Sequence, residues 1–252
     1  MGVMANSTTR VLCFGTQARD RAGCCDRMRA AGTEVVARVE PSGGPASCEA
    51  APLYATAADA VRETGANAAF IDTLPGAAAD AMMEAVDAGL SLVVCKTRAV
   101  PARDMVKVIN YVHGSTDLAG PRHHEDRIRL LGPGSGGVIT PGAGMVGTLN
   151  VDVFSPGRVG IVARCDALAE AAAAALTREG IGQSSCLVTS AALIVPTHLV
   201  DVLGMLEADP DTEVIVIIGG VGGDAESAAA AFIEEAVTKP VVAYLPGRSA
   251  PP

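Results

Sequence analysis

Residues 128–163 read IRLLGPGSGGVITPGAGMVGTLNVDVFSPGRVGIVA. The segment opens and closes with short apolar runs, at 128–132 and 158–163, and between them Gly and Pro cluster twice. Residues 133–156 show neither the period of a strand nor that of a helix. Because Gly and Pro clusters interrupt regular structure, we expect an irregular connection here and a domain boundary near Pro156.

On both sides of this connection, short apolar runs alternate with helix-like segments. The expected strands are 11–15, 34–39, a short one at Tyr54, 68–71, 90–95, 128–132, 158–163, 185–189, 214–219 and 240–245. The expected helices are 22–31, 57–64, 77–88, 101–112, 168–180, 199–208 and 225–237. This alternation predicts an α/β fold with parallel sheets covered by helices on both faces. Ligands of such sheets bind at the carboxyl ends of the strands.

Composition narrows the class of protein. The 252 residues are 49% hydrophobic and 3% aromatic, which is enough apolar material for two domains. The net charge of −9 and the scarcity of aromatic side chains argue against nucleic acid or an anionic membrane as partner. We therefore expect neither.

The cysteines and the start of the chain indicate a cytoplasmic protein. Seven cysteines are scattered without a C-x-x-C pair, and their odd number is typical of reduced, mostly structural thiols. The first ten residues, MGVMANSTTR, lack the apolar region of a signal peptide, and no apolar run approaches the length that crosses a bilayer.

The loops between these elements carry a more specific signal in their order. Successive stretches read VLCFGT, EPSGG, KTRAVPARDM, IRLLGPGSGG, RVGIVAR, VIVIIGGVGGDAES and TKPVVAYLPG. Taken together and in this order, they resemble the α subunit of succinate–CoA ligase and, more widely, the NDP-forming acyl-CoA synthetase superfamily.

The resemblance implies a fold, a reaction and partners. It implies a Rossmann-like CoA-binding domain over residues 1–156 and a flavodoxin-like ligase domain, short at its C-terminal end, over residues 157–252. In this family a phosphate passes from a nucleotide to a histidine and then to a carboxylic acid, and CoA displaces it. The implied cofactor is coenzyme A with no metal bound by this chain. The implied partner is an ATP-grasp β subunit that holds the nucleotide; a homo-oligomer is the alternative.

Three loops of the first domain correspond to CoA-binding loops of the family. In the first loop, the family pattern is Gly-x-Thr-Gly-x-x-Gly, and this chain lacks the later glycines. In the second, the family pattern is Pro-Gly-Lys-Gly-Gly, and the lysine is absent here. In the third, Thr-Glu-Gly-Ile-Pro, Arg98 replaces the glutamate. Arg98 then either binds a phosphate or is a surface charge at a helix start. The residues carried over as candidates are Gly15, Thr16, Gln17, Arg19, Pro41, Ser42, Gly43, Thr97 and Arg98.

The second domain departs further from the family pattern. The family's Ser-Arg-Ser-Gly opens a helix that binds phosphate, and here the equivalents are Ala163, Arg164, Cys165 and Asp166. Asp166 brings a carboxylate to the anion site, and it also suits a helix N-cap. Gly220 replaces a glutamate of Ile-Gly-Glu-Ile-Gly-Gly that contacts the active histidine in the family.

No histidine of the chain stands where the family has its phosphate carrier. The family continues into a Gly-His-Ala-Gly loop, and this chain ends at Pro252 before it. His113, His123 and His124 fall in or near a first-domain linker, so His198, at a helix start, is the one weighed as a substitute carrier against a plain surface role. Cys165 is weighed likewise as a reactive thiol against a structural one.

Three functional interpretations stay open at this stage. The chain is an active ligase subunit whose carrier is supplied elsewhere, a diverged subunit that acts as a scaffold or regulator, or a diverged enzyme of acyl or carbamoyl transfer. The resemblance favours a CoA-binding subunit that is catalytically impaired alone.

Overall fold

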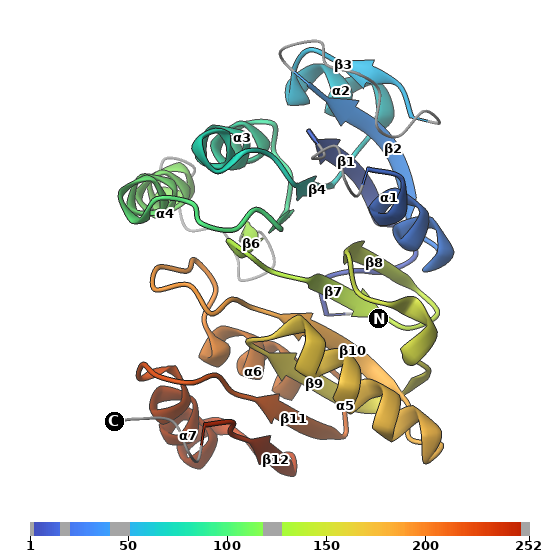
Figure 1. Cartoon of the computed structure of the whole chain (residues 1–252), viewed down its shortest axis with the longest axis vertical. Coiled ribbons are helices and arrows are strands. Elements are labelled where there is room, and N and C mark those ends of the chain that lie inside the picture. The colour runs from blue at the N-terminus through green and yellow to red at the C-terminus, as the bar shows by residue number, and fades with distance from the viewer. Residues whose placement is uncertain (1–2, 16–20, 41–50, 118–127, 248–252) are drawn as a thin grey trace.

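The computed structural model describes residues 3–15, 21–40, 51–117 and 128–247, without the side chains of 21, 22 and 113–117. Within this part of the chain two sheets stack one above the other, and a hairpin lies between them (Figure 1). The α/β class predicted from the alternation of strands and helices is confirmed.

The first sheet is parallel throughout its described strands, in the order β3-β2-β1-β4-β5-β6. Its strands are β1 (Arg10–Phe14), β2 (Glu34–Val39), β3 (Leu53–Tyr54), β4 (Ala68–Ile71), β5 (Leu92–Cys95) and β6 (Arg129–Leu131). Its helices are α1 (Arg21–Ala30), α2 (Ala57–Thr64), α3 (Pro75–Asp87) and α4 (Ala102–Asp117). Chain order reverses between β1 and β4, which is the switch point where such sheets bind ligands.

The two faces of this sheet are buried differently because side chains alternate along each strand. Leu12 and Phe14 pack with α2, α3 and α4 in one apolar cluster. Val11 and Cys13 point the other way, into a second cluster that α1 shares with the second sheet. One face is therefore covered by helices, and the other joins the rest of the molecule.

The second sheet has the order β12-β11-β9-β10-β7-β8. Its parallel strands are β9 (Pro156–Ala163), β10 (Gln183–Val188), β11 (Val214–Ile218) and β12 (Val241–Tyr244). Its helices are α5 (Asp166–Arg178), α6 (Leu199–Ala208) and α7 (Ala225–Ala236). In Figure 1, α5 crosses in front of this sheet and α6 lies behind it.

The stretch expected to be irregular, residues 133–156, contains regular structure, and that expectation was wrong. It forms the antiparallel hairpin of β7 (Gly137–Thr140) and β8 (Gly144–Gly147), then the short 3-10 helix η2 (Val151–Val153). β7 pairs with β10, so the hairpin extends the second sheet. The boundary near Pro156 stays a prediction, and it falls between strands of one sheet.

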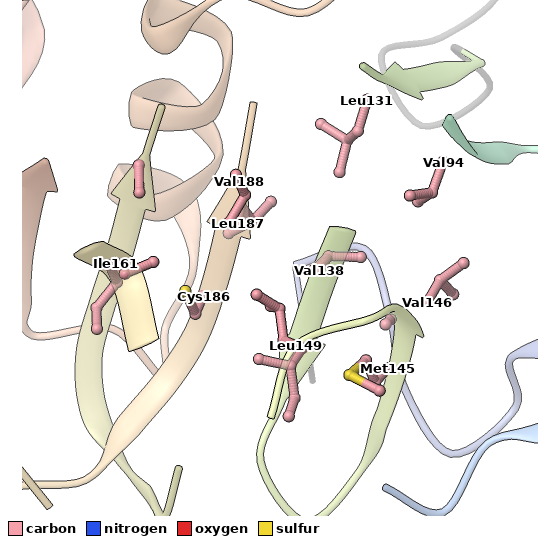
Figure 2. Close-up of a cluster of buried hydrophobic side chains, with 14 of the residues drawn as sticks. Val94, Leu131, Val138, Met145, Val146, Leu149, Ile161, Cys186, Leu187 and Val188 are labelled. Atoms are coloured by element: carbon pink, nitrogen blue, oxygen red, sulfur yellow. The ribbon is translucent and has the colours of Figure 1, made fainter. Parts of the chain in front are cut away.

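The hairpin connects the two halves through a shared core. Val94 and Leu131 of the first sheet point toward Val138 and Val146 of the hairpin, and Leu187 lies beyond them on the second sheet (Figure 2). At the same junction Thr33 Oγ1 donates to the Met145 carbonyl at 2.8 Å and accepts from the Met145 amide at 2.7 Å. The Thr33 side chain thereby pairs with both backbone groups of Met145 on the edge strand β8.

None of the described helices is long and apolar enough to cross a bilayer.

Candidate functional site

The carboxyl ends of the two sheets meet at one group of charged side chains. β5 of the first sheet leads directly to Lys96, and β9 of the second leads to Asp166 in the first turn of α5. Lys96 Nζ donates to Asp166 Oδ2 at 2.9 Å, and Arg98 Nη2 lies 3.7 Å from the same oxygen. Residues 70 positions apart in sequence are thereby joined across the junction.

Asp166 is the first residue of α5, and Cys165 before it is the N-cap, so the N-cap role expected for Asp166 was wrong. Burial opposes ionisation of the Asp166 carboxyl. The hydrogen bond and charge of Lys96, its own backbone N–H and the charge of Arg98 outweigh burial and hold its pKa below the ordinary value. The positive end of the α5 dipole acts in the same direction. Asp166 is therefore a carboxylate, and its side chain is 25% exposed.

The loop before the hairpin leaves room for these side chains. A β-carbon built on Gly136 would lie 2.8 Å from Cβ of Asp166, closer than real atoms approach. A β-carbon on Gly134 would lie 3.4 Å from Cγ of Arg98, and Gly134 has a φ of 76°, which favours glycine. The bare backbone at Gly136 is thus required for Asp166 to sit where it does.

A second charged group lies further along the second sheet. Arg164 Nη1 donates to both oxygens of the Glu226 carboxylate, at 2.8 and 3.1 Å, and the side chains are 11% and 17% exposed. The Gly220 amide donates to Glu226 Oε1 at 2.7 Å. A β-carbon on Gly220 would lie 2.9 Å from Arg164 Nη1, so the guanidinium occupies the space beside this glycine.

Hydrogen bonds from hydroxyl groups fix the first-domain loops to the second domain. Ser135 Oγ donates to the Val188 carbonyl at 2.5 Å, and Ser190 Oγ donates to the Pro133 carbonyl at 2.5 Å. Thr197 Oγ1 donates to the Leu130 carbonyl at 2.8 Å. The segment from β6 to β7 is therefore held to the carboxyl end of the second sheet at several points.

Of the candidate CoA residues of the first domain, the structure describes Gly15, Thr97 and Arg98. Gly15 follows β1 at the switch point, and its amide donates to the Val39 carbonyl at 3.2 Å. Thr97 is 3% exposed, and its hydroxyl bonds to the backbone of residue 73, so it orders the loop after β4. Arg98 is 71% exposed and can reach a ligand. The other candidates lie outside the described residues: Thr16, Gln17, Arg19, Pro41, Ser42 and Gly43.

His198 has a structural role in the described contacts. It is the N-cap of α6, where its side chain accepts from the amide of Asp201 and its amide donates to the Asp201 carboxylate at 2.8 Å. This reciprocal capping uses one ring nitrogen as acceptor. The ring borders a cavity of about 320 Å³ that Arg164 also lines. Of the other histidines, the side chain of His113 and all of His123 and His124 lie outside the described part.

Sequence reasoning missed two members of the charged groups, Lys96 and Glu226. A signal existed for Lys96, because a charge directly after a buried strand lies at the edge of the sheet where ligands bind. Glu226 lies in the first turn of α7 and gave no comparable signal. Among the described residues, no cluster of His, Cys, Asp and Glu could hold a metal ion.

Comparison with known proteins gives two matching family models. Residues 6–99 match a model described as CoA binding domain, and residues 156–251 match one described as succinyl-CoA ligase like flavodoxin domain. These two models agree with the Rossmann-like and flavodoxin-like halves that the resemblance implied.

Curated relatives match over the whole chain. The succinate–CoA ligase [ADP-forming] subunit alpha of Aquifex aeolicus is 38% identical over 252 residues, which are 100% of this chain and 80% of that protein. The subunit alpha 2 of Archaeoglobus fulgidus is 37% identical over 100% of this chain and 84% of its own.

Solved structures agree on the fold at lower identity. ATP citrate lyase of Methanosaeta concilii has a TM-score of 0.81 at 20% identity, over 97% of this chain and 41% of that one. Dinucleotide-forming acetyl-coenzyme A synthetase 1 of Ca. Korarchaeum cryptofilum has a TM-score of 0.73 at 19% identity, over 96% of this chain and 51% of that one. The chain thus spans about half or less of these larger proteins, and on the strength of the curated relatives it belongs to the family of succinate–CoA ligase α subunits.

Proposed function

We propose that this chain is the CoA-binding subunit of an acid–thiol ligase whose second domain, alone, does not carry phosphate on a histidine. The observation that carries the proposal is the site around Gly220. Where the family pattern has a glutamate beside the active histidine, this chain has no side chain, and the Arg164 guanidinium fills the space. That guanidinium is neutralised by Glu226, which leaves less positive charge for a phosphoryl group.

The first domain fits coenzyme A in its described part. The switch point between β1 and β4 is free of a side chain at Gly15, and Arg98 offers an exposed cation beside the carboxyl end of β5. A bidentate guanidinium suits the phosphates of CoA, and close backbone approach at a glycine suits its diphosphate. CoA would supply the thiol that accepts the acyl group, while Gly15 and Arg98 orient it.

Titration of CoA into the full chain by calorimetry tests the binding half of the proposal. We expect saturable heat from CoA, and a weaker response after Arg98→Ala. Arg103→Ala is the matched control, because Arg103 is 84% exposed at the start of α4. Absence of heat at near-millimolar CoA would remove CoA binding from the proposal.

Nucleotide labelling tests the second half. The chain is incubated with an ATP-grasp β subunit of a related ligase and with ATP or GTP labelled at the γ-phosphate. We expect no label bound covalently to this chain, with a related α subunit as positive control. Label that stays on the chain after denaturation would overturn the impaired-transfer proposal.

Exposed apolar side chains at the carboxyl edge of the second sheet support a partner subunit. Leu193 is 94% exposed, Val221 is 63% exposed and Leu245 is 58% exposed. Leu193 and Val221 line the same cavity as Arg164. The curated relatives are named as alpha subunits, so we propose an ATP-grasp β-type subunit as the partner on this edge.

Replacing both Leu193 and Val221 with Asp is expected to abolish co-elution with such a partner in size-exclusion chromatography. The thermal midpoint should change little, because both side chains are mostly in solvent. Leu53→Asp is the control, since Leu53 is 45% exposed on β3 of the other sheet. Equal loss of co-elution in the control, or none in the double variant, would contradict this interface.

A further inference from the structure

A cavity of about 470 Å³ lies at the amino edge of the second sheet. Its lining comes from the starts of β9 and β10, from residue 211 before β11, from the turn of the β7–β8 hairpin and from residues 6–8 before β1. The charged groups around Asp166 and Arg164 follow the carboxyl ends of the strands, at the opposite edge of the same sheet. The volume is in the range of small-molecule sites. The cavity is therefore separate from the proposed CoA and partner surfaces.

The walls of this cavity are fixed by close backbone contact and by hydrogen bonds. A β-carbon on Gly157 would lie 2.3 Å from the carbonyl carbon of Gly182, so the starts of β9 and β10 touch backbone to backbone. On another side, Asn6 Oδ1 accepts from the amide of Thr8 at 2.8 Å and from its hydroxyl at 2.7 Å. Asn67 Nδ2 in turn donates to the Thr8 carbonyl at 2.9 Å. The cavity is thus formed before any ligand arrives.

Buried polar groups line the interior. The side chains of Thr140, Gln183 and Ser184 belong to the lining and are 9%, 1% and 7% exposed. Thr140 Oγ1 and Ser185 Oγ are 3.3 Å apart, which is long for two hydroxyl groups, so the Thr140 hydroxyl can turn to a ligand. The side-chain NH2 of Asn6 has no hydrogen-bond partner in the described part of the chain. A small polar molecule would therefore find hydrogen bonds here.

Two opposite charges complete the lining, on Arg158 and Asp211. Their side chains are 58% and 49% exposed, and Arg158 Nη1 lies 3.9 Å from Asp211 Oδ1. The other contacts of this guanidinium are 3.5 Å to the Pro210 carbonyl and 3.7 Å to Glu213. All three distances exceed those of charge-assisted hydrogen bonds, about 2.7–2.9 Å. The guanidinium is loosely held, and it stands beside a carboxylate.

We infer that this cavity binds a free α-amino acid with a small polar side chain. The Arg158 guanidinium and the Asn6 NH2 group bind the carboxylate, and the Asp211 carboxylate binds the ammonium. The buried hydroxyl groups of Thr140 and Ser184 meet the ligand side chain. This site goes beyond the proposed function, and a bound ligand would join residues 6–8 to the second sheet.

Calorimetric titration of the full chain tests the inference, with L-serine, L-threonine and L-asparagine as probes. We expect saturable heat from at least one of them, with a dissociation constant of about 1 mM or below. The amide derivative of that amino acid lacks the carboxylate, and the N-acetyl derivative lacks the ammonium. Each derivative should bind at least about tenfold more weakly, because one charge-assisted hydrogen bond is lost.

Variants assign the heat to this cavity. Arg158→Gln and Asp211→Asn are each expected to weaken binding about tenfold or more, for the same reason. Arg178→Gln is the matched control, because Arg178 is exposed in the last turn of α5 and outside the lining. Circular dichroism should show the same fold in all three variants, since each altered side chain is about half exposed or more.

The outcomes separate an amino-acid site from weaker alternatives. The inference is wrong if none of the three amino acids gives heat, or if Arg178→Gln weakens binding as much as Arg158→Gln. Equal binding of the free amino acid and its N-acetyl derivative, or of the unaltered chain and Asp211→Asn, would indicate a plain carboxylate site and would also overturn it.

Discussion

Replacing Gly137 with Ala is expected to lower the free energy of unfolding by about 3–5 kcal/mol, in the range of the largest single-residue effects. Gly137 opens β7 with a φ of 102°, which side chains of L-residues rarely adopt. A β-carbon there would lie 2.0 Å from the Val146 carbonyl oxygen and 2.7 Å from Cα of Gly147. Because both contacts are backbone of the paired strand, the hairpin would have to separate, and the core shared by the two sheets would open.

Urea unfolding followed by circular dichroism measures this effect. Gly76→Ala is the matched control, because Gly76 lies in the first turn of α3 with nothing within 4 Å of a built β-carbon. The control should stay within about 1 kcal/mol of the unaltered chain, since alanine favours a helix more than glycine. Similar unfolding midpoints for the two variants would mean that the hairpin does not hold the two halves together.

The same hairpin marks where local sequence stops predicting the fold. The runs EVVARV at 34–39 and VIVIIG at 214–219 predicted strands because a short apolar run of this length indicates a buried strand without any other information. The run GVIT at 137–140 is equally apolar, but it stands among glycines that local pattern associates with loops. Gly137 and Gly147 allow β7 and β8 to approach each other closely within the hairpin. β7 also pairs with β10, nearly fifty residues later in the chain. Pairing at that distance has no local signal.

The candidate site follows the same rule. Arg98, Arg164 and Asp166 were singled out by the resemblance to the family's loops, and these loops follow buried strands at the carboxyl edge of a sheet, where ligands bind. That they belong to two separate charged groups could not be predicted, because each group is completed by a residue on another element. Lys96 meets Asp166 across 70 positions, and Glu226 meets Arg164 across 62. The position of Thr97 near a strand end could be predicted, but its structural role could not, since its burial depends on how the loop after β4 packs.

Replacing Arg164 with Ala is expected to lower the free energy of unfolding by about 2–3 kcal/mol at pH 7, because it removes one partner of an ion pair whose side chains are only 11% and 17% exposed. The Glu226 carboxylate would keep the hydrogen bond from the Gly220 amide and lose both bonds from the guanidinium. Arg158→Ala is the control, since Arg158 is 58% exposed and its ion pairs are 3.7 and 3.9 Å long. Exposed pairs of this kind contribute at most about 1 kcal/mol.

The dependence of this loss on pH distinguishes two causes: a Glu226 carboxylate left without its cation, and the lost packing of the Arg164 side chain. Burial opposes ionisation of Glu226, but the hydrogen bond and charge of Arg164 and the Gly220 amide hold its pKa below the ordinary 4.5. A lowered pKa stabilises the folded state above the unfolded value, and this contribution is lost as pH falls through the folded value. Without Arg164, burial would raise the pKa of Glu226, so the carboxyl would take up a proton in acid and the cost of the variant would shrink below pH 5 or so.

Adding Glu226→Gln to Arg164→Ala should recover much of the loss at pH 7 and remove its dependence on pH. A loss that is the same at pH 7 and pH 4.5, or no larger than that of Arg158→Ala, would show that the guanidinium fills space beside Gly220 without neutralising a buried carboxylate.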